Sequence, residues 1–101
     1  MRLRIAVSAK HDLERIHRHY ERERNGLGSE FLDVIGHSIR RLKEFPNVWP
    51  LFHAGTRRLI LGRFPYGVVY RVGSTEIVVV LVAHLKRSPT YWRRRSAKSD
   101  G

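Results

Sequence analysis

The sequence has 101 residues, 42% of them hydrophobic, which fits a single folded domain and excludes a largely disordered chain. No apolar run approaches the roughly 20 residues of a membrane-spanning helix, and the absence of cysteine excludes disulfides, thiolate metal sites and cysteine nucleophiles, so we expect a cytoplasmic location. Twenty lysines and arginines against nine acidic residues give a formal net charge of +11, which favours a polyanionic partner: nucleic acid, a ribosomal surface or an acidic protein segment.

The N-terminal part of the chain predicts one strand followed by two helices. Residues 2–7 alternate basic and apolar side chains, the period of a half-buried strand. Ser8 then stands where a helix N-cap is expected, and residues 9–24 carry apolar side chains at helical spacing. Glycines in segment 25–28 break this helix, and a second amphipathic helix is expected over 29–45, ended by the proline that follows. Because the break is short, the two helices should form an antiparallel hairpin.

The following part of the chain predicts a loop and a sheet. Residues 46–56 contain two prolines and a glycine and are expected to form a loop, with Trp49 and Phe52 folding back on the core. Gly73-Ser74 has the composition of a two-residue hairpin turn. Around this turn, segments rich in Val, Ile and Leu predict three strands at residues 57–61, 66–72 and 75–83.

The C-terminal part predicts a short helix that begins with Pro89, followed by a frayed tail at residues 96–101. The element order is therefore βααβββ within one domain at residues 1–95. This order predicts an α+β fold, with the helical hairpin on one face of a small, mostly antiparallel sheet. The later arginines are expected to project from the other face of that sheet.

Four stretches of the sequence, in this order, resemble the RelE/ParE toxin superfamily of type II toxin–antitoxin systems. The first opens the first helix, the second ends the second helix, the third forms the central hairpin, and the last closes the sheet and begins the tail. They are Ser8–Ile16; Phe31 with Leu42–Pro46; Arg57–Leu59 with Gly62–Arg71; and Val82–Pro89 with Tyr91, Trp92 and Arg95.

The resemblance implies one of two activities. RelE-like members are ribosome-dependent mRNA endonucleases, whereas ParE-like members poison DNA gyrase and are not nucleases. The segments Arg63–Tyr66 and His84–Pro89 are closer to the ParE-like, plasmid-stabilisation branch. Both branches are neutralised by a cognate antitoxin, which we expect to cover the helical hairpin and reach the basic face of the sheet. Three hypotheses remain open: a gyrase-inhibiting toxin, an mRNA endonuclease, or a non-toxic relative that binds only its antitoxin.

A nuclease would need groups that transfer protons and cations that stabilise the charge developing on the phosphate. The candidate catalytic residues are Arg58, Arg63, His84, Arg87 and Tyr91. For His84, a structural role at the edge of the sheet is favoured over catalysis, because a fold-level resemblance does not by itself assign chemistry.

The remaining candidates concern binding. Arginines can neutralise phosphates while aromatic side chains stack on bases, so we expect a polyanion-binding or target-binding set. It comprises Arg57, Arg58, Arg63, Arg71, Arg87, Trp92, Arg93, Arg94 and Arg95. Phe64, Pro65 and Tyr66 are expected to be structural, and Asp12 is interpreted as a charge at the start of a helix. The histidines lack the spacing of a helical zinc site, so neither a metal nor another cofactor is predicted.

Overall fold

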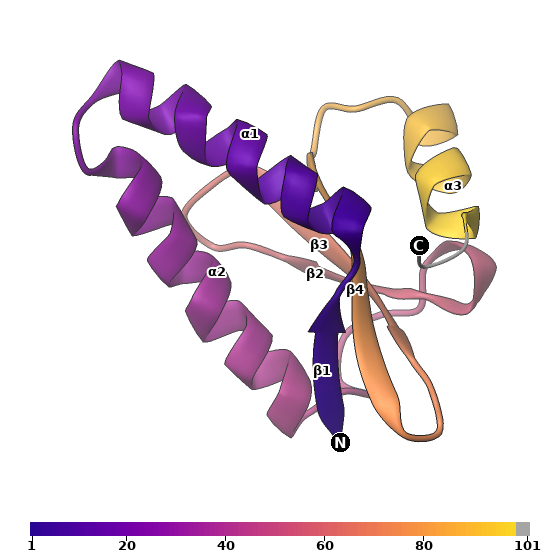
Figure 1. Ribbon diagram of the computed structural model, residues 1–101. Coiled ribbons are helices and arrows are strands. Elements are labelled where there is room, and N and C mark those ends of the chain that lie inside the picture. Colours follow the sequence, from indigo (N-terminus) through magenta and orange to yellow (C-terminus); the bar gives the residue numbers. More distant parts are fainter. Residues whose placement is uncertain (99–101) are drawn as a thin grey trace.

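The computed structural model describes residues 1–98 and contains a four-stranded sheet, three α-helices and one short 3₁₀ turn (Figure 1). The predicted order βααβββ is confirmed, with a third helix after the last strand. The elements are β1 (Arg2–Ile5), α1 (Val7–Glu23), α2 (Leu27–Glu44), the 3₁₀ turn (His53–Gly55), β2 (Arg57–Ile60), β3 (Tyr66–Val72), β4 (Glu76–His84) and α3 (Pro89–Ala97).

The sheet is mixed, with the strand order β1-β4-β3-β2. Strands β2, β3 and β4 form an antiparallel meander, and β1 adds to β4 in parallel. Strand β4 is therefore flanked on both edges, and its residues 77–83 are buried. This burial explains its apolar character on both faces, which a half-exposed strand would not show.

The helical hairpin covers one face of the sheet and encloses the main core. Phe31 and Leu42 of α2 and Tyr70 of β3 are completely buried. The Tyr70 hydroxyl donates a hydrogen bond to the carbonyl oxygen of Pro46 at 2.7 Å, which ties the loop after α2 to the sheet. Phe64 and Tyr66 are also buried in this core, as the sequence predicted.

The two helices approach closely at the turn that joins them. Gly28 lies in the first turn of α2, where a Cβ atom would be 2.6 Å from the backbone oxygen of His17 in α1. Across the same junction, the carboxylate of Glu21 accepts hydrogen bonds from backbone N–H groups at the start of α2, at 2.8 Å from Gly28. The backbone N–H of Gly26 is the largest influence that lowers the pKa of Glu21, with burial opposing it and the N–H of Gly28 next in size. Glu21 thus caps α2 from the neighbouring helix.

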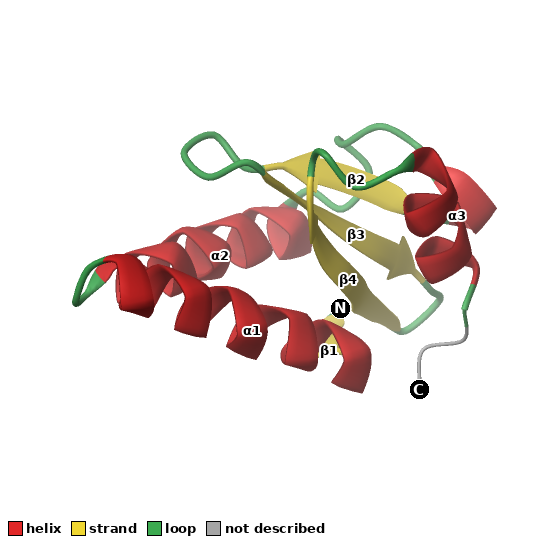
Figure 2. Cartoon of the chain, turned by 90° about the horizontal axis from the view of Figure 1, so that it is seen from above, coloured by secondary structure: helices red, strands yellow, loops and turns green. Residues whose placement is uncertain are grey.

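The second face of the sheet is covered by α3 and by the loop before β2, as the view in Figure 2 shows. Trp92 of α3 is buried against Val69, Val80 and Ala83, with Phe52 beside it. Arg58 and Arg71 lie on this side of the sheet, where the later arginines were expected, but the apolar side chains of this face are covered by the C-terminal helix.

Several predicted boundaries were also wrong. Helix α1 begins at Val7, so Ser8 is not its cap, and the Ser8 hydroxyl donates instead to the backbone oxygen of Val80 at 3.3 Å. The connection between β3 and β4 contains three residues rather than two. Helix α3 continues through Ala97, and Ser96 is buried, so the tail is not frayed at these two positions; residues 99–101 lie outside the described part of the chain.

Within residues 1–98, no helix is both long and apolar enough to cross a membrane.

Candidate functional site

A basic hollow lies where α1 passes the start of β3 and the end of β4. Its volume is about 370 Å³, and side chains from α1, from the start of β3 and from the end of β4 surround it. We call it the basic hollow; it is lined by Arg15, Ile16, His19, Arg22, Tyr66, His84 and Arg87. It brings together two of the five catalytic candidates, His84 and Arg87.

His84 is held at the last position of β4, opposite Tyr66 in the sheet register. The two rings meet edge to face with centroids 5.2 Å apart. The backbone N–H of Lys86 donates to Nδ1 of His84 at 3.0 Å, which leaves Nε2 as the second polar atom of the ring. In the neutral imidazole this bond places the proton on Nε2, for which no hydrogen-bond partner is present within residues 1–98.

Arg87 is fixed by the helix that follows it. Its guanidinium carbon lies 4.4 Å from the ring centroid of Tyr91 in α3. The Tyr91 hydroxyl in turn accepts a hydrogen bond from Arg95 at 2.6 Å, one turn further along the helix. Tyr91 therefore contributes its ring to Arg87, while its hydroxyl oxygen is engaged by Arg95.

Asp12 anchors this arrangement from inside the fold. Its side chain is 3% exposed and accepts hydrogen bonds from the backbone N–H of Val82 at 3.0 Å and from Arg95 at 2.8 Å. Burial disfavours the charged form of Arg95, but the hydrogen bond and the charge of Asp12 outweigh it, so the pKa of Arg95 is raised. Asp12 is thus not a helix-start charge as predicted: α1 begins earlier, and the carboxylate lies in a buried network that joins α1, β4 and α3.

The other three catalytic candidates, Tyr91, Arg58 and Arg63, do not line the hollow, and Arg58 and Arg63 have partners elsewhere. The guanidinium of Arg58 contacts the rings of Phe52 and Trp92, with its carbon 4.4 and 5.0 Å from their centroids. Arg63 is hydrogen-bonded to Glu30 of α2, and this bond is the largest influence that lowers the pKa of that carboxyl. The five candidates therefore do not line one common cavity.

Most members of the predicted polyanion-binding set are engaged within the protein. Arg57 donates to the backbone oxygen of Trp49 at 2.7 Å, and Arg71 donates to the backbone oxygen of Ser96 at 3.0 Å. Trp92 is 3% exposed and packs on the sheet, so it anchors α3 there and its ring is not presented at the surface. Arg95 is held by Asp12, whereas the side chains of Arg93 and Arg94 are exposed.

Sequence reasoning missed the contribution of α1 to the hollow. Arg15, His19 and Arg22 are spaced i, i+4 and i+7, which places them on one face of the helix. The signal for this contribution is the spacing of basic side chains on one face of the helix, separate from the apolar stripe that faces the core. Within residues 1–98, no group of three or more histidine and acidic side chains is arranged to hold a metal ion.

The order of elements and the α+β fold are those expected of the RelE/ParE-like toxins, and comparison with known proteins identifies the branch. Residues 3–89 match the family described as the ParE toxin of type II toxin–antitoxin system, parDE, and the chain belongs to this family. The resemblance deduced from the sequence is thereby confirmed. No match was found among curated proteins.

The chain is also similar to a solved structure, described as the chromosomal ParDE TA system from P. aeruginosa. The TM-score is 0.76 with 25% sequence identity, and the match covers 83% of this chain and 95% of the other. The likeness thus extends over nearly the whole of that chain.

Proposed function

We propose that this protein inhibits DNA gyrase in the cytoplasm and is neutralised by a cognate antitoxin. Its membership of the ParE family carries the proposal, because the resemblance stated above associates this branch with gyrase. The positions of the catalytic candidates support it. Arg58 and Arg63 contact other parts of the fold, so of the arginines among the catalytic candidates only Arg87 lies with His84 in the basic hollow.

The antitoxin would bind along the helical hairpin. A groove of about 430 Å³ lies there, lined by the apolar Leu13 and Leu32, by the cations Lys10 and Arg18, and by Glu14 and His17. Leu32 of α2 is 40% exposed at this groove, more than a core position would be. An amphipathic helix with acidic flanks fits such a groove, since apolar contacts supply affinity and charge complementarity to a chain of net charge +11 directs the encounter.

The experiment is a supercoiling and DNA-cleavage assay with purified gyrase, relaxed plasmid and increasing amounts of this chain, with a type II topoisomerase other than gyrase as the specificity control. We expect loss of supercoiling or accumulation of cleaved plasmid with gyrase only. An antitoxin encoded beside this chain should reverse the effect when added. Gyrase that stays fully active at a molar excess of folded toxin would refute the proposal.

The basic hollow favours one alternative, an mRNA endonuclease, because His84 and Arg87 line it together. Primer extension on total RNA after induced expression, with a stop-codon version of the same plasmid as control, distinguishes the two. Discrete mRNA cuts within minutes with normal plasmid supercoiling would support the nuclease. If growth, RNA and supercoiling are all unchanged while the chain is soluble, the third hypothesis, a relative that binds only its antitoxin, is favoured.

A further inference from the structure

The basic hollow contains more positive charge than the fold neutralises. Within residues 1–98, Arg22 and Arg87 form no ion pair with a carboxylate. Arg15 makes only a 3.4 Å contact with Asp12, whose carboxylate is bound more closely by Arg95. Arg22 and Arg87 therefore carry charge that no ion pair with a carboxylate in this part of the chain neutralises, and the repulsion among the cations of this hollow would be relieved by a bound anion.

Acidic residues near the hollow do not cancel this charge. Glu23 lies next to it in α1 and is 3.6 Å from His19, an exposed pair. Ile16 and Tyr66 are buried and form the apolar part of the lining. The arrangement is an apolar base with a rim of cations, open on one side.

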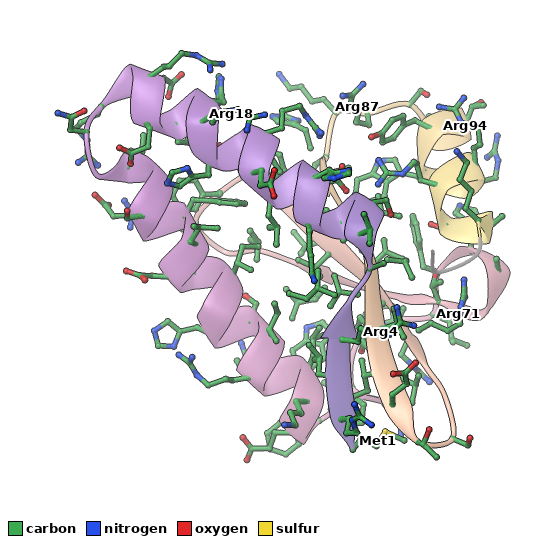
Figure 3. All side chains as sticks on the ribbon, viewed as in Figure 1. Met1, Arg4, Arg18, Arg71, Arg87 and Arg94 are labelled. Carbon is green, nitrogen blue, oxygen red and sulfur yellow. The ribbon has the colours of Figure 1, made fainter. Side chains whose placement is uncertain are left out.

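Arg87 is held against the ring of Tyr91 in α3. A guanidinium that stacks on an aromatic ring keeps its N–H groups in the plane, directed away from the ring edge. With Tyr91 at 4.4 Å behind it, the donors of Arg87 remain available. Figure 3 shows Arg87 and Arg94 at the same end of the molecule, far from Arg4 and the N-terminus.

We propose that the basic hollow binds a phosphodiester group of a nucleic-acid strand. A carboxylate presents two oxygens in one plane and is satisfied by a single arginine fork, whereas a phosphate presents oxygens in several directions and can be shared by several arginines. Here the donors come from α1 on one side and from the end of β4 and the segment after it on the other. The opening allows a continuous strand to pass, with Arg15 and Arg22 able to contact neighbouring phosphates along it.

This binding goes beyond the proposed function, because it requires neither gyrase nor antitoxin, and it can be measured with the isolated protein. The probe is a fluorescently labelled short single-stranded DNA, with anisotropy recorded from about 50 to 200 mM salt. The test variant is Arg22→Gln/Arg87→Gln. The matched control is Arg2→Gln/Lys43→Gln, which removes the same charge from exposed positions at the start of β1 and near the end of α2.

Each lost phosphate contact on a single strand should reduce the slope of log K against log salt by about 0.7. For the Arg22→Gln/Arg87→Gln variant we expect a reduction of about 1.4, which corresponds to about 25-fold weaker binding at 0.1 M salt. The control variant should change the slope much less. Far-UV circular dichroism and melting of both variants establish that each remains folded.

A second measurement locates the anion. Inorganic phosphate is titrated against ¹⁵N-labelled protein while the arginine side-chain Nε signals are followed by NMR, with acetate at equal ionic strength as the carboxylate comparison. We expect Arg22 and Arg87 to shift with phosphate and much less with acetate. Equal weakening by the two double variants, equal shifts at all exposed arginines, or equal response to acetate would each overturn the proposal.

Discussion

Breaking the buried ion pair between Asp12 and Arg95 should strongly destabilise this fold. The two residues are 83 positions apart in sequence, and their side chains are only 3% and 14% exposed. Replacing Arg95 with methionine roughly keeps the volume of the side chain. The buried Asp12 carboxylate then retains the backbone N–H of Val82 as a donor and a 3.4 Å contact with Arg15.

The expected loss in the free energy of unfolding follows from this geometry. Removing one partner of a buried pair destabilises a protein by about 3–5 kcal/mol, because the remaining charge is left without compensation. Since Arg15 can still approach Asp12, we take the low end, about 3 kcal/mol. For a domain of this size such a loss lowers the melting temperature by roughly 12–24 °C.

The assay is urea denaturation followed by circular dichroism, with Arg15→Met as the matched control. Arg15 contacts the same carboxylate but its side chain is 50% exposed, so its loss should cost no more than about 0.5 kcal/mol. Asp12→Asn keeps an oxygen for the N–H of Val82 while removing the charge, and it completes a double-mutant cycle with Arg95→Met. We expect a coupling energy above about 1 kcal/mol; a value below about 0.5 kcal/mol, or equal effects of Arg15→Met and Arg95→Met, would refute the reasoning.

Three further predictions concern the turn between the helices and the wall of the hollow. Folding lowers the pKa of Glu21 from 4.5. The ionised Glu21 side chain therefore stabilises the fold above pH 4.5, and this stabilisation is lost as the pH falls through the pKa of the folded state. Glu21→Gln should flatten the pH dependence of the unfolding free energy in this acid range. Gly28→Ala should cost about 1–3 kcal/mol in urea melts, because its methyl group would meet the backbone of α1 at 2.6 Å, whereas Gly36→Ala, with nothing nearer than 3.7 Å, should be neutral or stabilising. Tyr91→Leu removes the ring behind Arg87 without changing the charge, so we expect oligonucleotide binding to weaken about 2- to 5-fold with an unchanged salt slope, and Tyr91→Phe, which keeps the ring, to bind more tightly than Tyr91→Leu.

Local patterns were sufficient to predict most of the fold. Alternation of basic and apolar residues identified β1, and helical spacing identified α1 and α2, because each pattern reflects the face that the element buries. The range predicted for β3, 66–72, was confirmed at both ends. The start of α1 was missed because serine often caps helices. In the structure the Ser8 hydroxyl instead donates a hydrogen bond to the carbonyl oxygen of Val80 in β4. Such a competition between a local and a distant partner leaves no mark in the sequence.

The candidate site was less predictable, since it depends on pairings between distant segments. His84 and Arg87 were identified because they lie close together in sequence, and the structure places both in the basic hollow. The roles of Asp12 and Arg95 could not be foreseen, because an acidic residue in a helix and an arginine in a basic tail are both ordinary surface residues by type. Only the docking of α3 on the sheet makes them a buried pair.

The contacts of Asp12, Arg95 and Tyr91 connect helix α3, which covers one face of the sheet, to the geometry of the basic hollow. Asp12 binds Arg95, Arg95 binds the hydroxyl of Tyr91, and the ring of Tyr91 supports Arg87. Because each contact fixes the next side chain, whatever displaces α3 would remove the buried partner of Asp12 and the support of Arg87 at once. The position of the C-terminal helix therefore controls both the stability of the fold and the orientation of one wall of the hollow, although α3 contributes no residue to its lining.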